Sequence, residues 1–435
     1  MGNSYVIVVG AGAAGMMAAG RAAERGKKVI LLEKMEQPGK KILISGRTRC
    51  NITNTAEIDD FISMYGENGK FLYHAFHRFF REDLLVLLSK YGVEVKVERG
   101  GRIFPSSDNA GDVVRAFNKY LKEFQVEFHF NASVDEVFVE KGEVRGVRVN
   151  GALVPSSSVI LATGGASFPA TGSTGDGYRM AAALGHTIVK LRPALVPLIV
   201  EEIDLASAMQ GVSLKNVRLT SFRCRADRIN PGLTPHHDIG RGTGCPISRP
   251  PVIESRLGEM MMTHFGIGGP ITLQMSLAVV KALEEGPVSV SVDLKPGLSN
   301  EQLRRRLQRD FDTYSKRSLK HIMTGLLPAS VIEPVIRLSG VSPDKPGYRV
   351  DGEEKERLVQ TLKSFRFNIK QPLPLSSAMV TAGGVSLKEV DPYTMSSRLV
   401  RGLYFCGEVL DLDADTGGFN LQSAFSTGWL AGENV

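Results

Sequence analysis

A glycine-rich loop between two apolar segments dominates the start of this sequence. Residues 5–9 form a continuous apolar, β-branched run, as expected for a strand that is buried on both faces. The run leads directly into a G-x-G-x-x-G sequence at 10–15, then into an Ala/Met-rich segment that predicts a helix to about Arg25. A second apolar run follows at 28–32. This order predicts a β-α-β unit in a parallel sheet.

Each glycine of the loop has a physical role in binding a dinucleotide. Gly10 permits the tight turn, Gly12 lets the backbone approach a pyrophosphate, and Gly15 allows the helix to pack closely on the strand. The helix N-terminus offers N–H groups to the phosphates. Glu33 ends the second strand, where it can accept hydrogen bonds from ribose hydroxyls and disfavours a 2′-phosphate, so we expect FAD or NAD rather than NADP. The residues predicted to contact this half of the dinucleotide are Gly10, Gly12, Ala13, Ala14, Gly15, Glu33 and Lys34.

Segments far downstream favour FAD over NAD. Residues 158–165 predict another buried strand that ends in a glycine doublet, and residues 402–408 predict a strand that ends in Gly-Glu. The last helix of the chain is predicted to begin within 416–423. A nucleotide site that is completed at the other end of the chain is typical of flavoproteins with inserted substrate domains. Carboxylates here can hold ribityl hydroxyls, and N–H groups near Asn420 and Leu421 can face the N1–C2=O edge of the flavin and stabilise the reduced form. The residues predicted at this end are Ala162, Thr163, Gly164, Gly165, Gly407, Glu408, Asp411, Gly418, Asn420 and Leu421.

The composition is that of an ordinary globular protein. Of 435 residues, 43% are hydrophobic and 23% are charged, which excludes a disordered chain, a collagen-like repeat and a disulfide scaffold. Four cysteines lie far apart without a C-x-x-C pair, so we expect reduced thiols, a cytoplasmic location and no metal site. No run of 18 or more uniformly apolar residues occurs, so no membrane span is expected.

The net charge of +7 comes from the middle of the chain. Residues 214–256 hold eight Lys/Arg against three acids, and residues 301–322 hold seven against three. Such stretches suit an anionic substrate or nucleic acid, but a solvated helix face and a basic loop explain them more simply. Because 301–322 offers only Phe311 and Tyr314 for base stacking, a nucleic-acid partner is disfavoured.

Several blocks resemble the BaiN-like (BaiN/RdsA-type) NAD(P)/FAD-dependent oxidoreductases. The sequence KKILISGRTRCNITN at 40–54 is similar to the segment that follows the second strand in that family. Four further blocks match in order, and together they span essentially the whole chain. They are GRIFP at 101–105, ATGGASFP and GSTGDGY within 162–178, THFGIGGP at 263–270, and TAGGV through GFNLQ within 381–422.

The resemblance implies a Rossmann-like FAD-binding domain assembled from both chain ends, with an inserted β-barrel-like domain and a small helical domain. The residues agree, because 286–294 shows the alternation of a strand while 351–364 reads as an amphipathic helix. The expected boundaries are 1–192 for the first part of the FAD-binding domain, 193–298 for the β-rich domain, 299–370 for the helical domain and 371–435 for the second part of the FAD-binding domain.

The sequence departs from the family pattern in two places. Gly46-Arg47-Thr48 stands where the family usually has a glycine triplet, so the loop predicted beside the flavin carries an extra positive side chain. Residues 230–255 hold five prolines and four glycines and look like an expansion of a barrel hairpin. Both departures concern the substrate side of the protein rather than FAD binding.

The segment after this loop supplies further candidates for cofactor contact. Arg49, Cys50 and Asn51 are predicted to contact the pyrophosphate or the flavin, Arg49 above all because a guanidinium matches phosphate geometry. Cys50 is a weak candidate for a redox thiol because no resolving cysteine is near it in sequence. Lys40 and Lys41 are predicted phosphate or ribityl partners, with solvated lysines as the alternative.

Tyr178 and His264 are the two candidates for catalysis. Asp176 is a good helix N-cap, which explains its segment without any catalytic role; the alternative places Tyr178 at the flavin face. His264 is flanked by a glycine-rich loop and is either a proton donor or substrate contact, or a structural residue. In the resembling family the position of Val134 pairs its backbone with adenine. His236-His237 show no metal-ligand spacing and are expected in a surface loop.

These observations predict a flavin-dependent oxidoreductase. A reductant delivers hydride to FAD, which passes it to an unsaturated small molecule, anionic or neutral, while an acid or water supplies the proton. No second G-x-G-x-x-G occurs, so NAD(P)H is expected to share the substrate cleft transiently unless another donor is used. The resemblance implies NAD(P)H-linked C=C reduction, with steroid-like enones as one family substrate class. The alternatives are an RNA-modifying flavoprotein, a non-catalytic flavin redox sensor and an O₂-using oxidase; the oligomeric state is left open.

Overall fold

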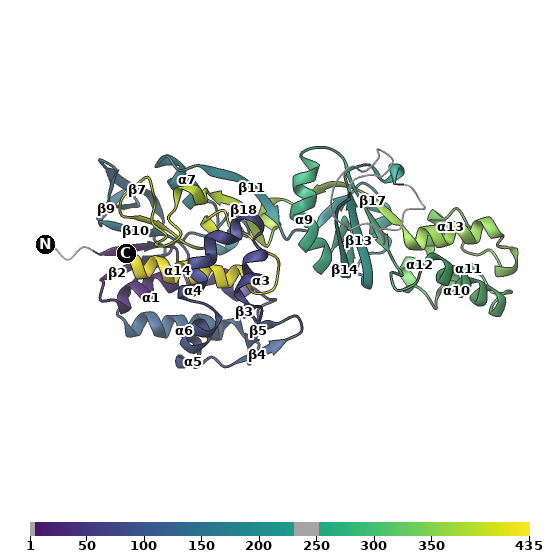
Figure 1. Ribbon diagram of the computed structural model, residues 1–435, viewed down its shortest axis with the longest axis horizontal. Helices are drawn as coiled ribbons and strands as arrows, with labels where there is room; N and C mark the ends of the chain where they lie inside the picture. The colour runs from purple at the N-terminus through teal and green to yellow at the C-terminus, as the bar shows by residue number, and fades with distance from the viewer. Residues whose placement is uncertain (1–4, 230–251) are drawn as a thin grey trace. The chain divides into compact units, whose positions relative to one another are not determined.

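The chain folds into two compact units. The computed structural model describes residues 5–229 and 252–435, so the predictions for His236-His237, Cys245 and most of the expanded hairpin lie outside the described residues (Figure 1). The first unit comprises Met1–Pro193 and Leu375–Val435, and the second comprises Ala194–Pro374.

The first unit is built on a parallel five-stranded sheet ordered β19-β10-β1-β2-β6. β1 and β2 are buried along their whole length, which explains why their sequences are continuous apolar runs rather than alternating ones. Because β19 comes from the far end of the chain, the prediction of a Rossmann domain assembled from both ends is confirmed. The strands are β1 (Val6–Val9), β2 (Val29–Leu32), β6 (Glu127–His129), β10 (Ser158–Leu161) and β19 (Leu403–Phe405).

Helices and three smaller sheets surround this sheet. The small sheets are ordered β3-β5-β4, β7-β8-β9 and β11-β18. Their strands are β3 (Thr53–Asn54), β4 (Val95–Glu98), β5 (Arg102–Pro105), β7 (Val134–Glu140), β8 (Glu143–Val149), β9 (Ala152–Pro155), β11 (Ile188–Ala194) and β18 (Val380–Val385). The helices are α1 (Ala13–Glu24), α2 (Lys40–Ile44), α3 (Ile58–Ser63), α4 (Tyr73–Arg78), α5 (Arg81–Lys90), α6 (Ala110–Glu123), α7 (Asp176–Ala183) and α14 (Phe419–Asn434).

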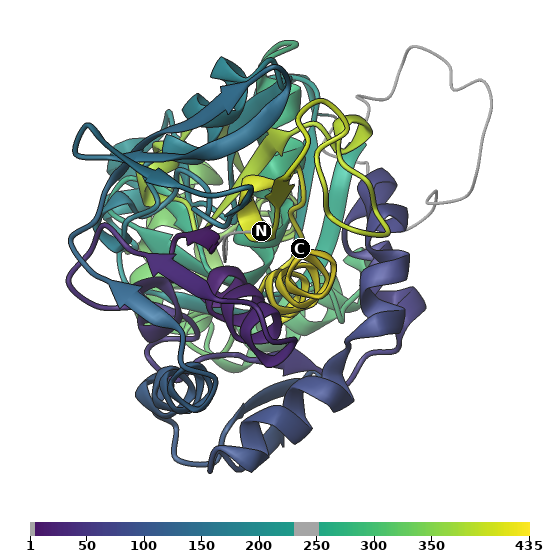
Figure 2. The same cartoon turned by 90° about the vertical axis from the view of Figure 1, so that its left-hand side faces the viewer.

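The first and last long helices of this unit pack with their backbones in contact (Figure 1, Figure 2). A Cβ atom on Gly428 would lie 2.3 Å from the carbonyl oxygen of Ala14, and one on Gly432 would lie 2.4 Å from that of Ala18. Only glycine fits at either position. The two helices therefore pack directly against each other, without a side chain between their backbones at these two positions.

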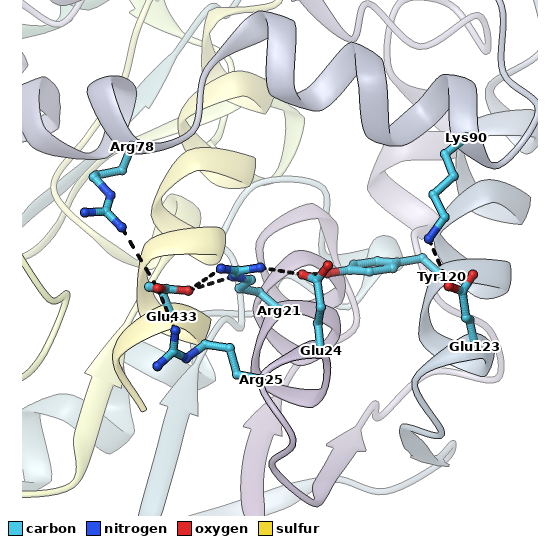
Figure 3. Close-up of polar contacts among 8 residues, drawn as sticks. All are labelled: Arg21, Glu24, Arg25, Arg78, Lys90, Tyr120, Glu123 and Glu433. Atoms are coloured by element: carbon cyan, nitrogen blue, oxygen red, sulfur yellow. Dashed lines mark hydrogen bonds and ion pairs between the residues drawn. The ribbon is translucent and has the colours of Figure 1, made fainter.

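An ion-pair network holds the C-terminal end of α14 (Figure 3). Glu433 lies in the last turn, where the helix dipole disfavours a negative charge. Its carboxylate lies 2.7 Å from Arg21, 2.8 Å from Arg25 and 4.0 Å from Arg78. The Arg21 guanidinium also lies 4.7 Å from the ring centroid of Trp429. Arginines from α1, from its C-cap and from α4 thus compensate a charge that α14 alone would not favour.

The second unit contains a closed antiparallel barrel with the strand order β12-β15-β14-β13-β16-β17. The inserted β-barrel predicted from the resemblance is therefore confirmed. The strands are β12 (Leu198–Val200), β13 (Ser213–Phe222), β14 (Val252–Thr263), β15 (Gly266–Gly268), β16 (Val288–Asp293) and β17 (Phe365–Pro372). The helices are α8 (Ile203–Ser207), α9 (Pro270–Leu283), α10 (Asn300–Thr313), α11 (Leu319–Met323), α12 (Ala329–Leu338) and α13 (Gly352–Lys363).

Barrel strands and helices of the second unit share one hydrophobic core. A buried ion pair also joins them: Lys363 of α13 lies 2.6 Å from Asp293 of β16, and both side chains are less than 5% exposed. The division of this insert into a β-rich domain at 193–298 and a helical domain at 299–370 remains a prediction.

Candidate functional site

The three glycines of the N-terminal loop face different surroundings. A Cβ on Gly10 would lie 2.6 Å from the carbonyl oxygen of Ala162, and one on Gly15 would lie 1.8 Å from that of Gly10. Gly12 differs, because nothing lies within 4 Å of a Cβ built there. Gly12 is also the N-cap of α1 and provides no side-chain cap. The first turn of α1 therefore faces open space, as an approaching pyrophosphate requires.

Glu33 lies beside this loop with its carboxylate fixed by backbone donors. The side chain is buried; one oxygen accepts from the N–H of Ala11 (2.7 Å) and the other from the N–H of Met35 (2.9 Å). A carboxylate offers about four acceptor positions, so two hydroxyl donors can still be accommodated. The N–H of Ala132 donates to the carbonyl oxygen of Glu33 (2.9 Å), which brings the start of β7, and with it Val134, to the same end of the sheet.

Lys34 extends from the same strand end toward the start of α7. Its ammonium lies 2.6 Å from the carboxylate of Asp176 and also contacts the Thr174 hydroxyl. Partial burial opposes ionisation of Asp176, but the hydrogen bonds from Lys34 and Thr174 outweigh it and lower the pKa of this carboxyl. The N-cap of α7 is Gly175, so the prediction of Asp176 as the N-cap is wrong by one residue. Gly175 has a positive φ of 83° that glycine adopts without strain, and Asp176 instead pairs with Lys34.

Three distant segments converge on the carboxylate of Glu408. One oxygen lies 2.7 Å from the Lys41 ammonium, and the other accepts from the N–H of Thr381 (2.9 Å) and from the Ser167 hydroxyl (3.2 Å). Lys41 also donates to Ser167 (2.9 Å). Gly165, one of the glycines predicted to contact the cofactor, leaves room for this cluster, since a Cβ there would lie 2.4 Å from the Thr381 hydroxyl.

The start of α14 is an open helix end. Its N-cap, Gly418, has φ of 96° and provides no side-chain cap. The Asn420 side chain turns back, accepting from the N–H of Ala414 (3.0 Å) and donating to the Ala414 carbonyl (2.8 Å). Leu421 lies partly buried in the same first turn. This end of α14 therefore resembles that of α1, with first-turn N–H groups available to a ligand.

The structure places two predicted cofactor residues in other contacts. Arg49 is 2.7 Å from Glu98 and 3.2 Å from Asp108, and its guanidinium lies 4.2 Å from the ring centroid of Phe104. Cys50 is fully buried, which raises the pKa of its thiol to about 12 and keeps it protonated at neutral pH. Their contact with a cofactor stays a prediction.

The two predicted catalytic residues lie in different units. The Tyr178 hydroxyl donates to the Glu408 carbonyl oxygen (3.0 Å), and burial raises the pKa of this phenol well above its ordinary value. His264 is exposed in the turn between β14 and β15, with its ring 4.9 Å from that of Phe265. A catalytic role for either residue stays a prediction.

A comparison with family models supplies the decisive observation. A model described as "HI0933-like protein Rossmann domain" matches residues 4–434. The chain belongs to the HI0933-like family of FAD-dependent oxidoreductases. The BaiN-like resemblance and the prediction of a flavoprotein oxidoreductase are thereby confirmed.

Two curated relatives match this HI0933-like chain over nearly its whole length. The "3-dehydro-bile acid delta(4,6)-reductase" of Clostridium scindens is 33% identical over 429 residues, which cover 98% of this chain and 97% of the relative. The "Ribosomal RNA dihydrouridine synthase" of Escherichia coli is 29% identical over 433 residues, or 99% of this chain and 97% of the relative. Among solved structures, the Mycobacterium smegmatis Sdh1 complex matches with a TM-score of 0.50 and 16% identity, covering 99% of this chain and 67% of that one. That likeness shows the fold alone.

The residues of this HI0933-like chain fit FAD. Gly12 faces open space at a helix start, and Glu33 retains acceptor capacity beside it. Near the start of α14, Thr53 Oγ1 and Gln422 Oε1 are fully buried and have no hydrogen-bond partner in the described part of the chain. Neither atom is accessible to solvent, so the fit to FAD rests on Gly12, Glu33 and the uncapped start of α14.

Sequence reasoning missed the residues of this HI0933-like chain that support the predicted ones. Ser167 and Thr381 hold the Glu408 carboxylate, while Asn54 and Asn68 bind the backbone before α14 and Tyr65 binds that of its first residue. Their partners are 27 to 363 residues away, so no local spacing signals them. Asn54, Ser167 and Thr381 lie inside the family blocks at 40–54, 162–178 and 381–422, and this position was their only signal in the sequence.

Three further observations concern metal ligands, cysteines and membrane helices among the described residues. Within residues 5–229 and 252–435, no three His, Cys, Asp or Glu side chains are grouped as metal ligands would be. Cys50, Cys224 and Cys406 are all free. Among the described helices, none is both long and apolar enough to cross a bilayer.

Proposed function

We propose that this chain is an FAD-dependent reductase that uses NAD(P)H to reduce an activated C=C bond of a small molecule. The observation that carries the proposal is the full-length match at 33% identity to a protein named as a bile acid reductase. When bound, FAD supplies an atom that accepts a hydride from a donor and passes it to an acceptor. The first turns of α1 and α14 would supply N–H donors to this cofactor, and the carboxylates of Glu33 and Glu408 would supply acceptors for its hydroxyls.

The proposed contacts follow the geometry of the first unit. The first turn of α1 binds the pyrophosphate, Glu33 binds the adenosine ribose, and the backbone at Val134 pairs with adenine. Glu408 and Asp411 hold ribityl hydroxyls, with Lys41 beside Glu408. The other residues proposed to contact FAD are Gly10, Gly12, Ala13, Ala14, Gly15, Lys34, Lys40, Arg49, Cys50, Asn51, Ala162, Thr163, Gly164, Gly165, Gly407, Gly418, Asn420 and Leu421.

Of the two catalytic candidates, His264 suits proton donation better. Its imidazole is exposed in the turn between β14 and β15, and an imidazole can both donate and accept a proton. The Tyr178 hydroxyl already donates to the Glu408 carbonyl, and its raised pKa makes it a weak acid. We propose that Tyr178 positions the turn at Gly407–Val409 and that His264 contacts the substrate.

RNA is a second candidate substrate. The match at 29% identity to a ribosomal RNA dihydrouridine synthase supports it, and so does the exposed face of α4. There Tyr73 lies against His77, with ring centroids 4.2 Å apart, and His74 lies against Tyr393 at 4.9 Å. Exposed aromatic rings suit base stacking. The basic helix α10 supports it less, because Arg304 and Arg306 are paired with Glu356 and Asp310.

Anaerobic reduction tests the proposal. The FAD-loaded protein is mixed with NADH or NADPH and followed at the flavin absorbance. The reduced protein then receives a conjugated steroid enone or a uridine-containing RNA. We expect bleaching by one nicotinamide and reoxidation by the enone. Reoxidation by the RNA alone would favour the second candidate, and a protein that does not bind FAD would overturn the proposal.

A further inference from the structure

The start of α14 is held from outside by one short segment of the chain. Four polar side chains within residues 51–68 bind the backbone of residues 411–419. Tyr65 donates from its hydroxyl to the Phe419 carbonyl oxygen (2.7 Å), and Asn54 donates to that of Gly417 (2.9 Å). Asn68 donates to the Asp411 carbonyl oxygen (2.8 Å). Asn51, with its amide oriented to satisfy both ends, accepts from the Gly418 N–H (2.9 Å).

Packing reinforces these four contacts. A Cβ on Gly418 would lie 2.4 Å from the carbonyl oxygen of Thr53, so the two backbones touch. The ring centroids of Phe61 and Phe419 lie 4.7 Å apart in an edge-to-face arrangement. Tyr65 and Asn54 are both buried, at 5% exposed each. The position of the first residue of α14 is therefore set by several contacts at once.

Three of the four contacts are made to backbone carbonyl oxygens rather than to N–H groups. A helix start is usually stabilised by a side chain that accepts from its first-turn N–H groups. Here the N-cap is glycine, and the segment at 51–68 holds the turn by Gly417, Phe419 and Asp411 oxygens instead. None of these contacts uses an N–H group of residues 419–421. The start of α14 is thus held by carbonyl oxygens, while its first-turn N–H groups, at the positive end of the helix dipole, make none of these contacts.

We propose that Tyr65 and Asn54 are positioning residues that determine where the open end of α14 meets the flavin, and so set the relative affinity of the site for reduced and oxidised FAD. This inference rests on the proposed function, in which the first turn of α14 faces the flavin. Reduced flavin carries more negative charge than oxidised flavin, so a helix N-terminus at fixed distance stabilises the reduced form more. Loosening the helix start weakens that preference without removing any atom that contacts FAD.

The midpoint potential of the bound flavin tests the inference. Tyr65→Phe removes one hydroxyl, and Tyr120→Phe is the matched control, because Tyr120 is also buried and its hydroxyl lies 3.3 Å from Glu24 (Figure 3). We expect Tyr65→Phe to bind reduced FAD three- to tenfold more weakly relative to oxidised FAD. A tenfold change lowers the midpoint potential by about 30 mV. Tyr120→Phe is expected to leave the potential unchanged.

Each other outcome has a defined meaning. If Tyr65→Phe binds FAD with the wild-type potential, or if both variants shift it equally, the inference is wrong while the proposed function stands. If the wild-type protein binds no FAD, the proposed function itself fails. If Tyr65→Phe does not fold, Asn54→Ala replaces it, since Asn54 is the other residue named in the inference and donates to the Gly417 carbonyl oxygen. An unchanged potential in that variant also contradicts the inference.

Discussion

The ammonium of Lys41 lies 2.7 Å from the carboxylate of Glu408, although the two residues are 367 positions apart. Lys41 belongs to α2, whose N-cap Gly39 donates its N–H to the Ala11 carbonyl in the nucleotide loop (2.9 Å). Glu408 lies in a turn that touches α1, because a Cβ on Gly407 would be 2.7 Å from the Cβ of Ala14. The pair therefore links both ends of the chain beside the proposed pyrophosphate site.

Glu408→Gln tests the importance of this pair. The side chains are only 28% and 19% exposed, so losing the carboxylate leaves a partly buried ammonium without its counter-charge. We expect a loss of about 2 kcal/mol in the free energy of unfolding and weaker FAD binding. Glu356→Gln is the control, because its pair with Arg304 is more exposed and should cost less than about 1 kcal/mol. Urea unfolding measures both, and equal losses would contradict the role given to Glu408.

The glycines of the nucleotide loop should respond differently to alanine. Gly12 has φ of −79° and open space around its Cβ direction, so Gly12→Ala should keep the stability of the protein or raise it by about 0.4–1 kcal/mol. FAD affinity should nevertheless fall, since the added methyl group occupies the pyrophosphate position. Gly15→Ala should impair folding, because its Cβ would overlap the Gly10 carbonyl. Thermal melts and FAD titration separate the two; unchanged FAD affinity in Gly12→Ala would place the phosphates elsewhere.

Glu433→Gln should loosen the C-terminal end of α14. Arg21, Arg25 and Arg78 would then face one another without the carboxylate that they share. We expect a loss of about 1–2 kcal/mol at low salt, and a smaller loss at 1 M salt, where exposed charges are screened. Unfolding at the two salt concentrations measures this, with Glu301→Gln on the exposed face of α10 as the control. A loss that does not depend on salt would show that packing, rather than charge, dominates there.

His186 should make stability depend on pH. Its ring is buried, with Nε2 3.0 Å from the Ser397 hydroxyl and Nδ1 3.3 Å from Glu389. Burial lowers the pKa of His186 from 6.5 despite the opposing effect of Glu389. The unfolded chain therefore binds the proton first, so this contribution to stability is present above about pH 6.5 and is lost as the pH falls toward the folded-state pKa.

His186→Gln provides the test of that pH dependence. The variant cannot titrate at this position, so its stability should change less than that of the wild type between pH 6.5 and pH 4.5. Ser397 accepts from the N–H groups of Leu399 (3.0 Å) and Val400 (2.9 Å) and so remains anchored without the imidazole. Denaturant titrations across this range measure the difference. Parallel curves for the two proteins would mean that other groups, such as Glu389, carry the effect.

Local patterns in the sequence were sufficient for the nucleotide-binding unit. The G-x-G-x-x-G loop, the buried strands around it and Glu33 all depend on short-range geometry, and the sheet has these elements where the patterns predict them. The predicted N-cap at Asp176 was wrong by one residue, because a glycine with positive φ can replace a side-chain cap. The residue type of Arg49 predicts that it binds an anion. Its position in the sequence does not predict that Glu98 and Asp108 lie within 3.2 Å of its guanidinium.

The sequence by itself determined the family, the Rossmann unit built from both chain ends and the inserted barrel. These depend on apolar periodicity, glycine conformations and blocks of residues that can be compared along the chain. Only the tertiary structure decided which side chains support the site: Lys41 with Glu408, and Tyr65 and Asn54 with the start of α14. The physical reason is that these contacts join segments hundreds of residues apart, and a hydrogen bond of that kind has no spacing rule.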